Sequence, residues 1–265
     1  MTRVGRVERL WRYPVKSMIG EELPFADVGP HGLLGDRGRA LVDDARVGSA
    51  KQSKRWPELF ATRAEYLREP TAADLAPPVR LTLPDGTRMT SDDERLPALL
   101  RRRFGREVHL TDAPPDRARS GEELDDGREA SFELHRGTFF DDAVLHLVTT
   151  TALARLAAEH PAGEFAPERF RPNVLIAPSD GRPGFHEDAW IGCRLGLGDE
   201  VELRVTGACR RCVMVTLEQE GRARDPRILR TAAQLHDAEV GVYAAVVRGG
   251  RVRPGDPITR LEGDL

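Results

Sequence analysis

Short β-prone segments bounded by turn-forming residues recur along most of the chain. In the first of them, VGRVERLWRYPV, polar and apolar residues alternate until Pro14 interrupts regular strand pairing. The next segments are RALVD, ELFATRAEYL, VRLTL and TRMT. Asp85-Gly86 joins the last two and favours a hairpin, because both residues tolerate a positive φ. The N-terminal part is therefore predicted to be mainly β.

One helix and one polar segment interrupt this pattern. Residues 92–104 (DDERLPALLRRRF) carry acids at the start and bases at the end, as the helix dipole favours, although Pro97 falls in the middle. Residues 112–128 are polar, rich in turn formers and almost free of apolar side chains, which is typical of a domain boundary or a mobile loop. We therefore expect two domains, 1–118 and 119–265.

The second half alternates strands with helices. The apolar segment AVLHLV leads into Thr149-Thr150-Thr151 and the helical run ALARLAAEH, so a threonine is the natural N-cap. Further strands are expected at NVLIA, EVELRVTG, CVMVTLE and GVYAAVVR, and a further helix from Pro226 to His236. The predicted fold class is mainly β with α (α+β).

Composition limits the possible functions. The 265 residues are 40% hydrophobic and can bury a large core, while the net charge of -3 gives no basic field, so we expect no nucleic-acid partner. No segment approaches the roughly 18 apolar residues of a spanning helix, so we expect no membrane span. The alternating first 15 residues are unlike a secretory signal, which predicts a cytoplasmic protein.

The chain has three cysteines, Cys193, Cys209 and Cys212, too few and too unevenly placed for a disulfide-stapled domain. The C-x-x-C spacing of the last two allows a dithiol, half of a zinc site, a single metal-binding thiolate or a buried inert thiol. A dithiol needs a helix after its first cysteine, whereas VMVTLE predicts a strand; a zinc site lacks a second pair of ligands. Arg210 and Arg211 would favour the Cys212 thiolate and could hold a phosphate.

Several other segments suit an anion. Lys16 and Ser17 follow the first strand in a loop whose amides can face an anion, and the turn from Gly32 ends in the charge pair Asp36-Arg37. Helix amides near Thr149 and Thr150 could also bind an anion. Each segment has a structural alternative as well: a solvated loop lysine, a salt-bridged turn and a helix cap.

Two later segments are more ambiguous. The amide of Asn173, in Arg169-Phe170-Arg171-Pro172-Asn173, could bind the edge of a heterocycle or close a turn after the proline. Glu187-Asp188-Ala189-Trp190 contains paired carboxylates, but we interpret it as a structural turn anchored by Trp190.

Taken in order, these segments resemble the MOSC family. They are Tyr13-Pro14-Val15-Lys16-Ser17, Gly32-Leu33-Leu34-Gly35-Asp36-Arg37, Arg169-Phe170-Arg171-Pro172-Asn173, Glu187-Asp188-Ala189-Trp190-Ile191-Gly192, Arg211-Cys212 and the ending Val252-Arg253-Pro254-Gly255-Asp256-Pro257. The resemblance covers most of the chain and is of the kind seen in amidoxime-reducing components and their bacterial relatives. It implies an N-terminal MOSC β-barrel domain at 1–118 and a MOSC β-barrel domain with flanking helices at 119–265.

The resemblance also implies a cofactor. Cys212 would be the catalytic residue and the metal ligand, holding molybdenum beside the two dithiolene sulfurs of the molybdenum cofactor, Mo-molybdopterin. Cys209 is not expected to be a ligand. Arg210 stands where relatives often carry a small residue, and could alter the phosphate grip or narrow substrate access. The expected cofactor-binding residues are Lys16, Ser17, Arg37, Thr149, Thr150, Arg171, Asn173, Arg210, Arg211 and Cys212.

The function implied by the resemblance is reduction of N-hydroxylated small molecules, such as amidoximes, hydroxylamines and N-hydroxylated bases, to the amine and water. The chain lacks the C-x₄-C-x₂-C cysteines of a plant-type ferredoxin, so we expect electrons from a separate flavoprotein, cytochrome or ferredoxin-type partner. Two alternatives stay open: a non-catalytic carrier of the cofactor or of sulfur, and a domain that binds only a partner protein.

Overall fold

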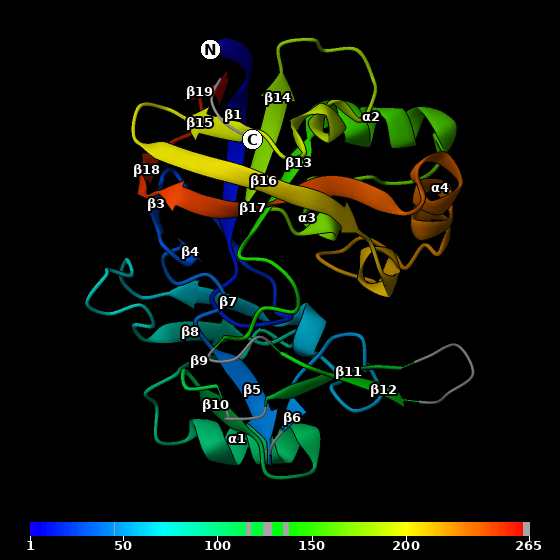
Figure 1. Cartoon of the computed structure of the whole chain (residues 1–265). Coiled ribbons are helices and arrows are strands. Elements are labelled where there is room, and N and C mark those ends of the chain that lie inside the picture. The colour runs from blue at the N-terminus through cyan, green and yellow to red at the C-terminus, as the bar shows by residue number, and fades with distance from the viewer. Residues whose placement is uncertain (45, 115–117, 124–128, 135–137, 262–265) are drawn as a thin grey trace. The chain divides into compact units, whose positions relative to one another are not determined.

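The computed structural model describes residues 1–44, 46–114, 118–123, 129–134 and 138–261. The chain forms two compact units, and each is assembled from separate parts of the sequence (Figure 1). Unit 1 comprises Met1–Trp11, Glu22–Leu34 and Ala143–Leu265; unit 2 comprises Arg12–Glu21 and Gly35–Asp142. Strands dominate and helices are few, which confirms the α+β prediction. The domain boundary at 118 and 119 stays a prediction; it falls at the start of β11 (Arg119–Glu123).

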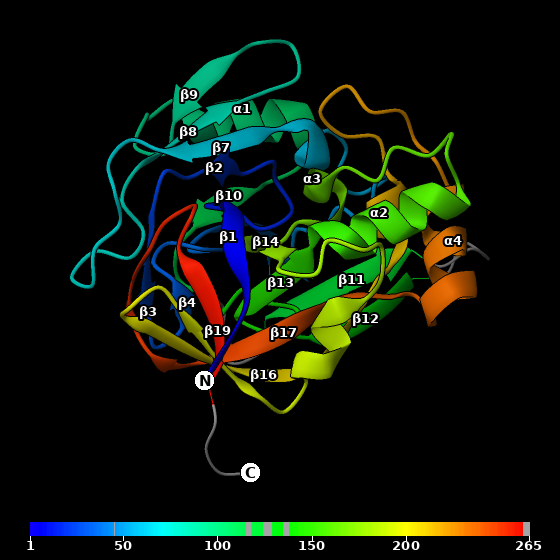
Figure 2. The ribbon, with the colours of Figure 1, turned by 90° about the horizontal axis from the view of Figure 1, so that it is seen from above.

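A closed barrel of seven strands forms the body of unit 1. The strands pair in the order β14-β13-β17-β16-β15-β19-β1, and β1 pairs back with β14 (Figures 1 and 2). Closure leaves none of these strands as an open edge. Their bounds are β1 (Thr2–Arg12), β13 (Leu145–Thr149), β14 (Val174–Pro178), β15 (Arg194–Leu197), β16 (Val201–Arg210), β17 (Glu239–Arg248) and β19 (Pro257–Leu261).

The period-two alternation of the sequence explains how the barrel is filled. In β16 the buried Leu203 and Val205 alternate with the exposed Arg204 and Thr206, so one face of the strand enters the core. A small sheet of β3 (Ala26–Gly29), β4 (Gly32–Leu33) and β18 (Gly250–Val252) adds side chains to the same core. Core members include Val7, Leu10, Leu147, Ile176, Trp190, Leu195, Val242, Ala244 and Ile258.

Helices α2 (Thr150–Glu159) and α4 (Arg227–His236) contact each other and lie beside β13, β14 and β17 (Figure 2). Thr149 caps α2: its side chain accepts a hydrogen bond from the amide of Ala152 at 3.1 Å, which confirms the predicted cap. The short helix α3 (Pro167–Phe170) precedes β14. Among the described residues, no helix combines the length and apolar character needed to cross a membrane.

Within its described residues, unit 2 contains two sheets and one α-helix. Strands β10 (His109–Thr111), β5 (Ala40–Asp43), β6 (Arg46–Val47), β11 and β12 (Glu129–Glu133) form one sheet; β7 (Arg63–Tyr66), β8 (Val79–Thr82) and β9 (Arg88–Thr90) form the other. Helix α1 (Leu96–Phe104) begins four residues later than the predicted Asp92, so Pro97 lies in its first turn, where a missing N–H costs no hydrogen bond. Strand β2 (Glu21–Glu22) lies where the chain passes from unit 2 to unit 1.

Three local predictions differ from the structure. Only Arg63–Tyr66 of the expected strand ELFATRAEYL is β, because Leu59–Ala61 forms the 3₁₀ helix η1. Part of the expected polar loop at 112–128 forms β11, which pairs with β12, while residues 115–117 and 124–128 lie outside the described residues. The strand predicted for CVMVTLE is also wrong: β16 ends at Arg210, and Val213–Thr216 forms the 3₁₀ helix η3.

Barrel closure gives a testable prediction at Gly5, which pairs with Pro178 of β14 and Ile258 of β19. A Cβ at this position would lie 2.6 Å from the carbonyl oxygen of Ala177. We therefore expect Gly5→Ala to lower the free energy of unfolding by about 1–3 kcal/mol, measured by urea denaturation. The control is Gly207→Ala in β16, where an added Cβ meets nothing within 4 Å. Equal stability of the two variants would contradict a close approach at the closing strand.

Candidate functional site

Cys212 lies just beyond the end of β16. The residue is partly exposed, its backbone is extended (φ -119, ψ -174), and its carbonyl accepts a hydrogen bond from the amide of Val215 at 3.3 Å at the start of η3. Cys209, by contrast, is fully buried within β16. The residue after Cys209 is still strand, so this first cysteine lacks the helix N-terminus that a thioredoxin-like dithiol requires. Cys212 is therefore the accessible thiol of the pair.

Arg211 is fixed from several directions. Its amide donates to the carbonyl of Ala238 at 2.7 Å, and its Nη2 donates to the carbonyl of Phe170 at 2.7 Å. Its Nη1 donates to the sulfur of Cys209 and lies 3.3 Å from Nε2 of His146. Burial alone would lower the pKa of Arg211, but the charges of Cys209, Tyr243 and Cys212 raise it. Arg211 is therefore an inward-facing cation beside Cys212.

Because successive side chains of a strand point to opposite faces, Arg210 faces away from the side that Arg211 occupies. Its backbone pairs with Glu239 of β17 and its side chain is exposed. Among the described residues, its guanidinium has no hydrogen-bond or ion-pair partner. Arg210 and Arg211, which the sequence presents as one dibasic pair, therefore have different environments.

His146 is a site residue that sequence reasoning missed. It lies in β13, is 6% exposed, and its ring centroid is 5.8 Å from that of Tyr243 on the neighbouring strand β17. Its Nε2 lies 3.3 Å from the carbonyl oxygen of Val240 and equally far from Arg211. The available signal was a single polar residue in the otherwise apolar segment AVLHLV, since a buried polar group needs partners.

Asn173 connects two barrel strands. Its Oδ1 accepts a hydrogen bond from the amide of His146 at 3.1 Å, and its Nδ2 donates to the carbonyl of Trp11 at 3.4 Å. The side chain is fully buried, so its amide bonds the backbones of β13 and β1. Arg171 precedes it, buried and in the left-handed region (φ 52), and its amide bonds the carbonyls of Pro167 and Glu168 to end α3.

The predicted threonines differ in their bonding. Thr149 donates to Oε2 of Glu187 at 2.5 Å and accepts from Thr151 and Ala152, so its hydroxyl is fully bonded within the protein. Thr150 is the partly exposed first residue of α2, and its hydroxyl has no hydrogen-bond partner among the described residues. These contacts leave Thr150 with the uncommitted hydroxyl of the two.

Glu187 lies in the 3₁₀ helix η2 (His186–Trp190), which ends at the buried Trp190. The structural interpretation of this turn is confirmed. The carboxyl of Glu187 is fully buried, and its Oε1 has no hydrogen-bond partner among the described residues. Burial raises the pKa of this carboxyl, so the neutral form is favoured.

In unit 2, Lys16 is buried and its ammonium donates to the carbonyl of Phe139 at 2.9 Å and to the carboxylate of Asp141. Lys51 lies 3.7 Å from the same carboxylate. Burial lowers the pKa of Lys16. Burial alone would raise the pKa of Asp141, but Lys16 and Lys51 bring it below its ordinary value. The structural alternative of a solvated loop lysine therefore does not hold for Lys16, whose buried ammonium pairs with the partly exposed carboxylate of Asp141.

The other predicted residues of unit 2 have left-handed backbones. Arg37 has φ 50, pairs with Asp36, and lies over the rings of Tyr13 and Phe140 at 5.1 and 5.4 Å. Ser17 has φ 62 and is buried, and its hydroxyl has no hydrogen-bond partner among the described residues. Lys16, Ser17 and Arg37 thus give unit 2 two cations and one uncommitted hydroxyl.

Two protein-family models match this chain. The model of the MOSC domain matches residues 105–259, and the model of the MOSC N-terminal beta barrel domain matches residues 4–95. The chain belongs to the MOSC family.

Relatives whose names state an activity are distant in sequence. Mitochondrial amidoxime reducing component 2 of Rattus norvegicus is 26% identical over 98% of this chain and 85% of that protein. Molybdenum cofactor sulfurase of Homo sapiens is 23% identical over 89% of this chain, which spans only 29% of that protein. The solved structure of the YUAD protein of Bacillus subtilis is 14% identical, covers 97% of this chain and 94% of its own, and has a TM-score of 0.47.

Glu187 gives a prediction about pH. Because burial raises the pKa of this carboxyl above its ordinary 4.5, the folded chain binds the proton more tightly than the unfolded chain. The free energy of unfolding should therefore fall as the pH rises from the ordinary pKa through the folded one. Glu187→Gln should flatten this part of the profile, measured by urea denaturation between about pH 5 and about pH 8. The exposed Glu218→Gln is the control, and a wild-type slope in Glu187→Gln would contradict the prediction.

The Lys16 ion pair gives a second prediction. Asp141→Asn removes the carboxylate facing an ammonium whose side chain is 5% exposed, so we expect the free energy of unfolding to fall by about 2 kcal/mol at neutral pH. Because the pKa of Asp141 is depressed, this stabilisation is lost as the pH falls through the folded pKa. Asp180→Asn breaks the exposed pair with Arg182 and should change stability little. Equal losses in the two variants would contradict an ion pair that stabilises the buried ammonium of Lys16.

Proposed function

We propose that this chain binds the molybdenum cofactor through the thiolate of Cys212 and reduces N-hydroxylated small molecules. The observation that carries the proposal is a partly exposed cysteine directly after the half-buried cation Arg211, in a member of the MOSC family. A thiolate is the soft donor that such a metal centre takes.

The predicted residues of unit 1 include polar groups that suit an anionic ligand. Arg210 and Thr150 have polar groups that are uncommitted among the described residues, so we propose them as direct contacts. Thr149, Asn173 and Arg211 are already bonded within the protein, and we propose that they contribute mainly by shaping the site. Arg171 stays a proposed phosphate contact.

For unit 2 we propose an anion-binding role for Lys16, Ser17 and Arg37. Two cations and an uncommitted hydroxyl are the donors that a phosphate or a pterin oxygen accepts from. Lys16 already faces Asp141, so Arg37 and Ser17 are the residues with more donor capacity to offer. This role rests on the donor chemistry of unit 2 by itself.

When bound, the cofactor supplies the two electrons that, with two protons, convert an N-hydroxylated compound into the amine and water. Within the chain, Cys212 supplies the thiolate and Arg210 offsets negative charge near it. Arg211 holds its own position through Phe170 and Ala238 and so fixes the backbone that enters Cys212. The electrons would come from a separate flavoprotein, cytochrome or ferredoxin-type protein.

A second candidate function is a carrier of the cofactor or of sulfur. It is favoured by the relative named molybdenum cofactor sulfurase, because most of this chain matches a minor part of that larger protein. In such a carrier the Cys212 thiolate would hold the cargo without turning over a substrate.

The ligand assignment is tested by metal analysis. We expect wild-type protein from a cofactor-competent host to contain molybdenum near one atom per chain, and Cys212→Ser to lose at least about nine tenths of it, since one metal–thiolate bond is removed. Cys193→Ser, at the other partly exposed cysteine, should keep the metal. Stoichiometric molybdenum in Cys212→Ser would overturn the assignment.

Turnover separates the two candidate functions. Molybdenum-loaded wild type is mixed with a chemical reductant and benzamidoxime, and benzamidine is measured by chromatography. An oxidoreductase should form benzamidine, and Cys212→Ser should reduce its rate by at least about 100-fold, because the reacting centre is lost. No product from fully loaded wild type would favour the carrier.

A further inference from the structure

Arg169 has an unusual set of partners for a buried cation. Its side chain is 2% exposed, yet among the described residues its hydrogen-bond partners are all backbone carbonyls and none is a carboxylate. The guanidinium donates to the oxygens of Glu164 (3.0 Å), Val215 (3.4 Å), Leu217 (3.0 Å) and Ala223 (2.7 Å). Burial lowers the pKa of Arg169, and these carbonyl dipoles face its charge.

Three of these carbonyls belong to residues 213–223, the 213–223 loop, which begins immediately after Cys212. The loop starts as η3 (Val213–Thr216), and the end of a helix leaves carbonyls without partners inside it. Arg169 supplies donors to Val215 and Leu217 at that end. This explains why a β-prone sequence forms a 3₁₀ turn here.

The other side of Cys212 is held by the adjoining residue of α3. Phe170 follows Arg169 in the chain, and its carbonyl accepts the hydrogen bond from Arg211 at 2.7 Å. Helix α3 therefore contacts the chain on both sides of Cys212: Arg211 before it, and the 213–223 loop after it. Two consecutive residues of one short helix, Arg169 and Phe170, therefore bond the chain after and before Cys212.

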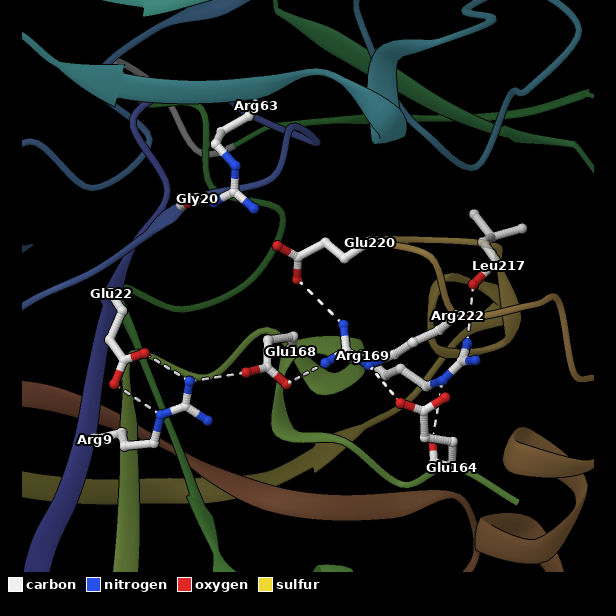
Figure 3. A network of polar contacts seen from close by, with 10 residues as sticks. All are labelled: Arg9, Gly20, Glu22, Arg63, Glu164, Glu168, Arg169, Leu217, Glu220 and Arg222. Atoms are coloured by element: carbon white, nitrogen blue, oxygen red, sulfur yellow. Dashed lines mark hydrogen bonds and ion pairs between the residues drawn. The ribbon is translucent and has the colours of Figure 1, made fainter. Parts of the chain in front are cut away.

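Ion pairs add a second connection near the end of the loop. Arg222 lies 2.9 Å from Glu164 and 3.3 Å from Glu168, both near or in α3, and 3.4 Å from Glu220 (Figure 3). Glu168 also pairs with Arg9 of β1 at 3.0 Å. These side chains are more exposed than Arg169, so the carbonyl contacts of Arg169 should dominate the position of the loop.

We propose that Arg169 is a positioning residue for Cys212: it holds the 213–223 loop to α3 and thereby fixes the backbone that presents the thiol. The reason for such positioning rests on the proposed function, because a metal centre needs its thiolate ligand in a fixed position. Its physical content, the restraint on Cys212, can be measured without any cofactor.

The test uses the full chain from a host that cannot make the cofactor, and the probe is iodoacetamide. Alkylation rates of the three cysteines are measured by mass spectrometry of their peptides. In Arg169→Gln, the rate at Cys212 relative to Cys193 should rise about tenfold, the change that loss of one charge-assisted hydrogen bond allows. The buried Cys209 reports larger opening, so its rate should stay near that of wild type.

Arg222→Gln is the matched control, because it removes ion pairs at the same loop and leaves the carbonyl contacts of Arg169 in place. Its Cys212 rate should stay within about twofold of wild type. A wild-type ratio in folded Arg169→Gln, or an equal rise in both variants, would overturn the proposal. A parallel rise at all three cysteines would mean a general structural role and would overturn it too.

If Arg169→Gln does not fold, Arg169→Lys keeps the charge and should give a smaller rise of the same ratio. If neither folds, hydrogen exchange of the wild type decides. The 213–223 loop should exchange at least about tenfold more slowly than the exposed turn at 179–184, and equal rates would overturn the proposal.

Failure of the proposed function has a different signature. Wild type that takes up no molybdenum while Arg169→Gln still alters thiol reactivity would refute the cofactor and leave the positioning role standing. Conversely, Cys212-dependent molybdenum with unchanged thiol reactivity in Arg169→Gln would refute the positioning role alone.

Discussion

The pairing of β1 with both β14 and β19 is the constraint on which unit 1 depends. These two ladders close the barrel, and they join the first strand of the chain to strands that lie more than 160 residues later. Without them, β14 and β19 would be open edges, and the core formed around Val7 and Leu10 would lose one wall. Closure also brings the predicted site residue Asn173 between two strands, because its side chain bonds Trp11 of β1 and His146 of β13 at once.

Outside the barrel strands, arginine side chains bond the backbone carbonyls that strand pairing would otherwise satisfy. Arg211 bonds the carbonyl of Phe170, and Arg169 bonds carbonyls of the 213–223 loop. Irregular backbone exposes carbonyls that no neighbouring strand can satisfy, and a guanidinium offers several donors in one plane. The surroundings of Cys212 are thus held by cations that face inward, while Arg210 faces outward.

Much of the fold could be predicted from local patterns. Period-two alternation indicated β1, the expected strands EVELRVTG and GVYAAVVR correspond to β16 and β17, and the threonine run indicated the cap of α2. Local patterns failed where distant residues decide. The β-prone Val213-Met214-Val215 is held as a 3₁₀ turn by Arg169, over 40 residues away, and the composition of the two units follows from non-local pairing of β1.

For the site, residue types indicated Cys212, but the sequence could not separate Thr149 from Thr150 or Arg210 from Arg211, because their difference lies in partners contributed by other elements. His146 carried no chemical motif and was missed.

The contacts that Arg169 makes have a consequence for divergence. It reaches the loop through main-chain oxygens, and all twenty amino acids, proline included, carry that same oxygen. Side chains along this stretch can therefore be exchanged during evolution without removing the anchor, provided that its length and path are kept. Because Arg169 bonds only the main chain of the loop, related proteins could change the loop side chains near Cys212 while the position of Cys212 is kept.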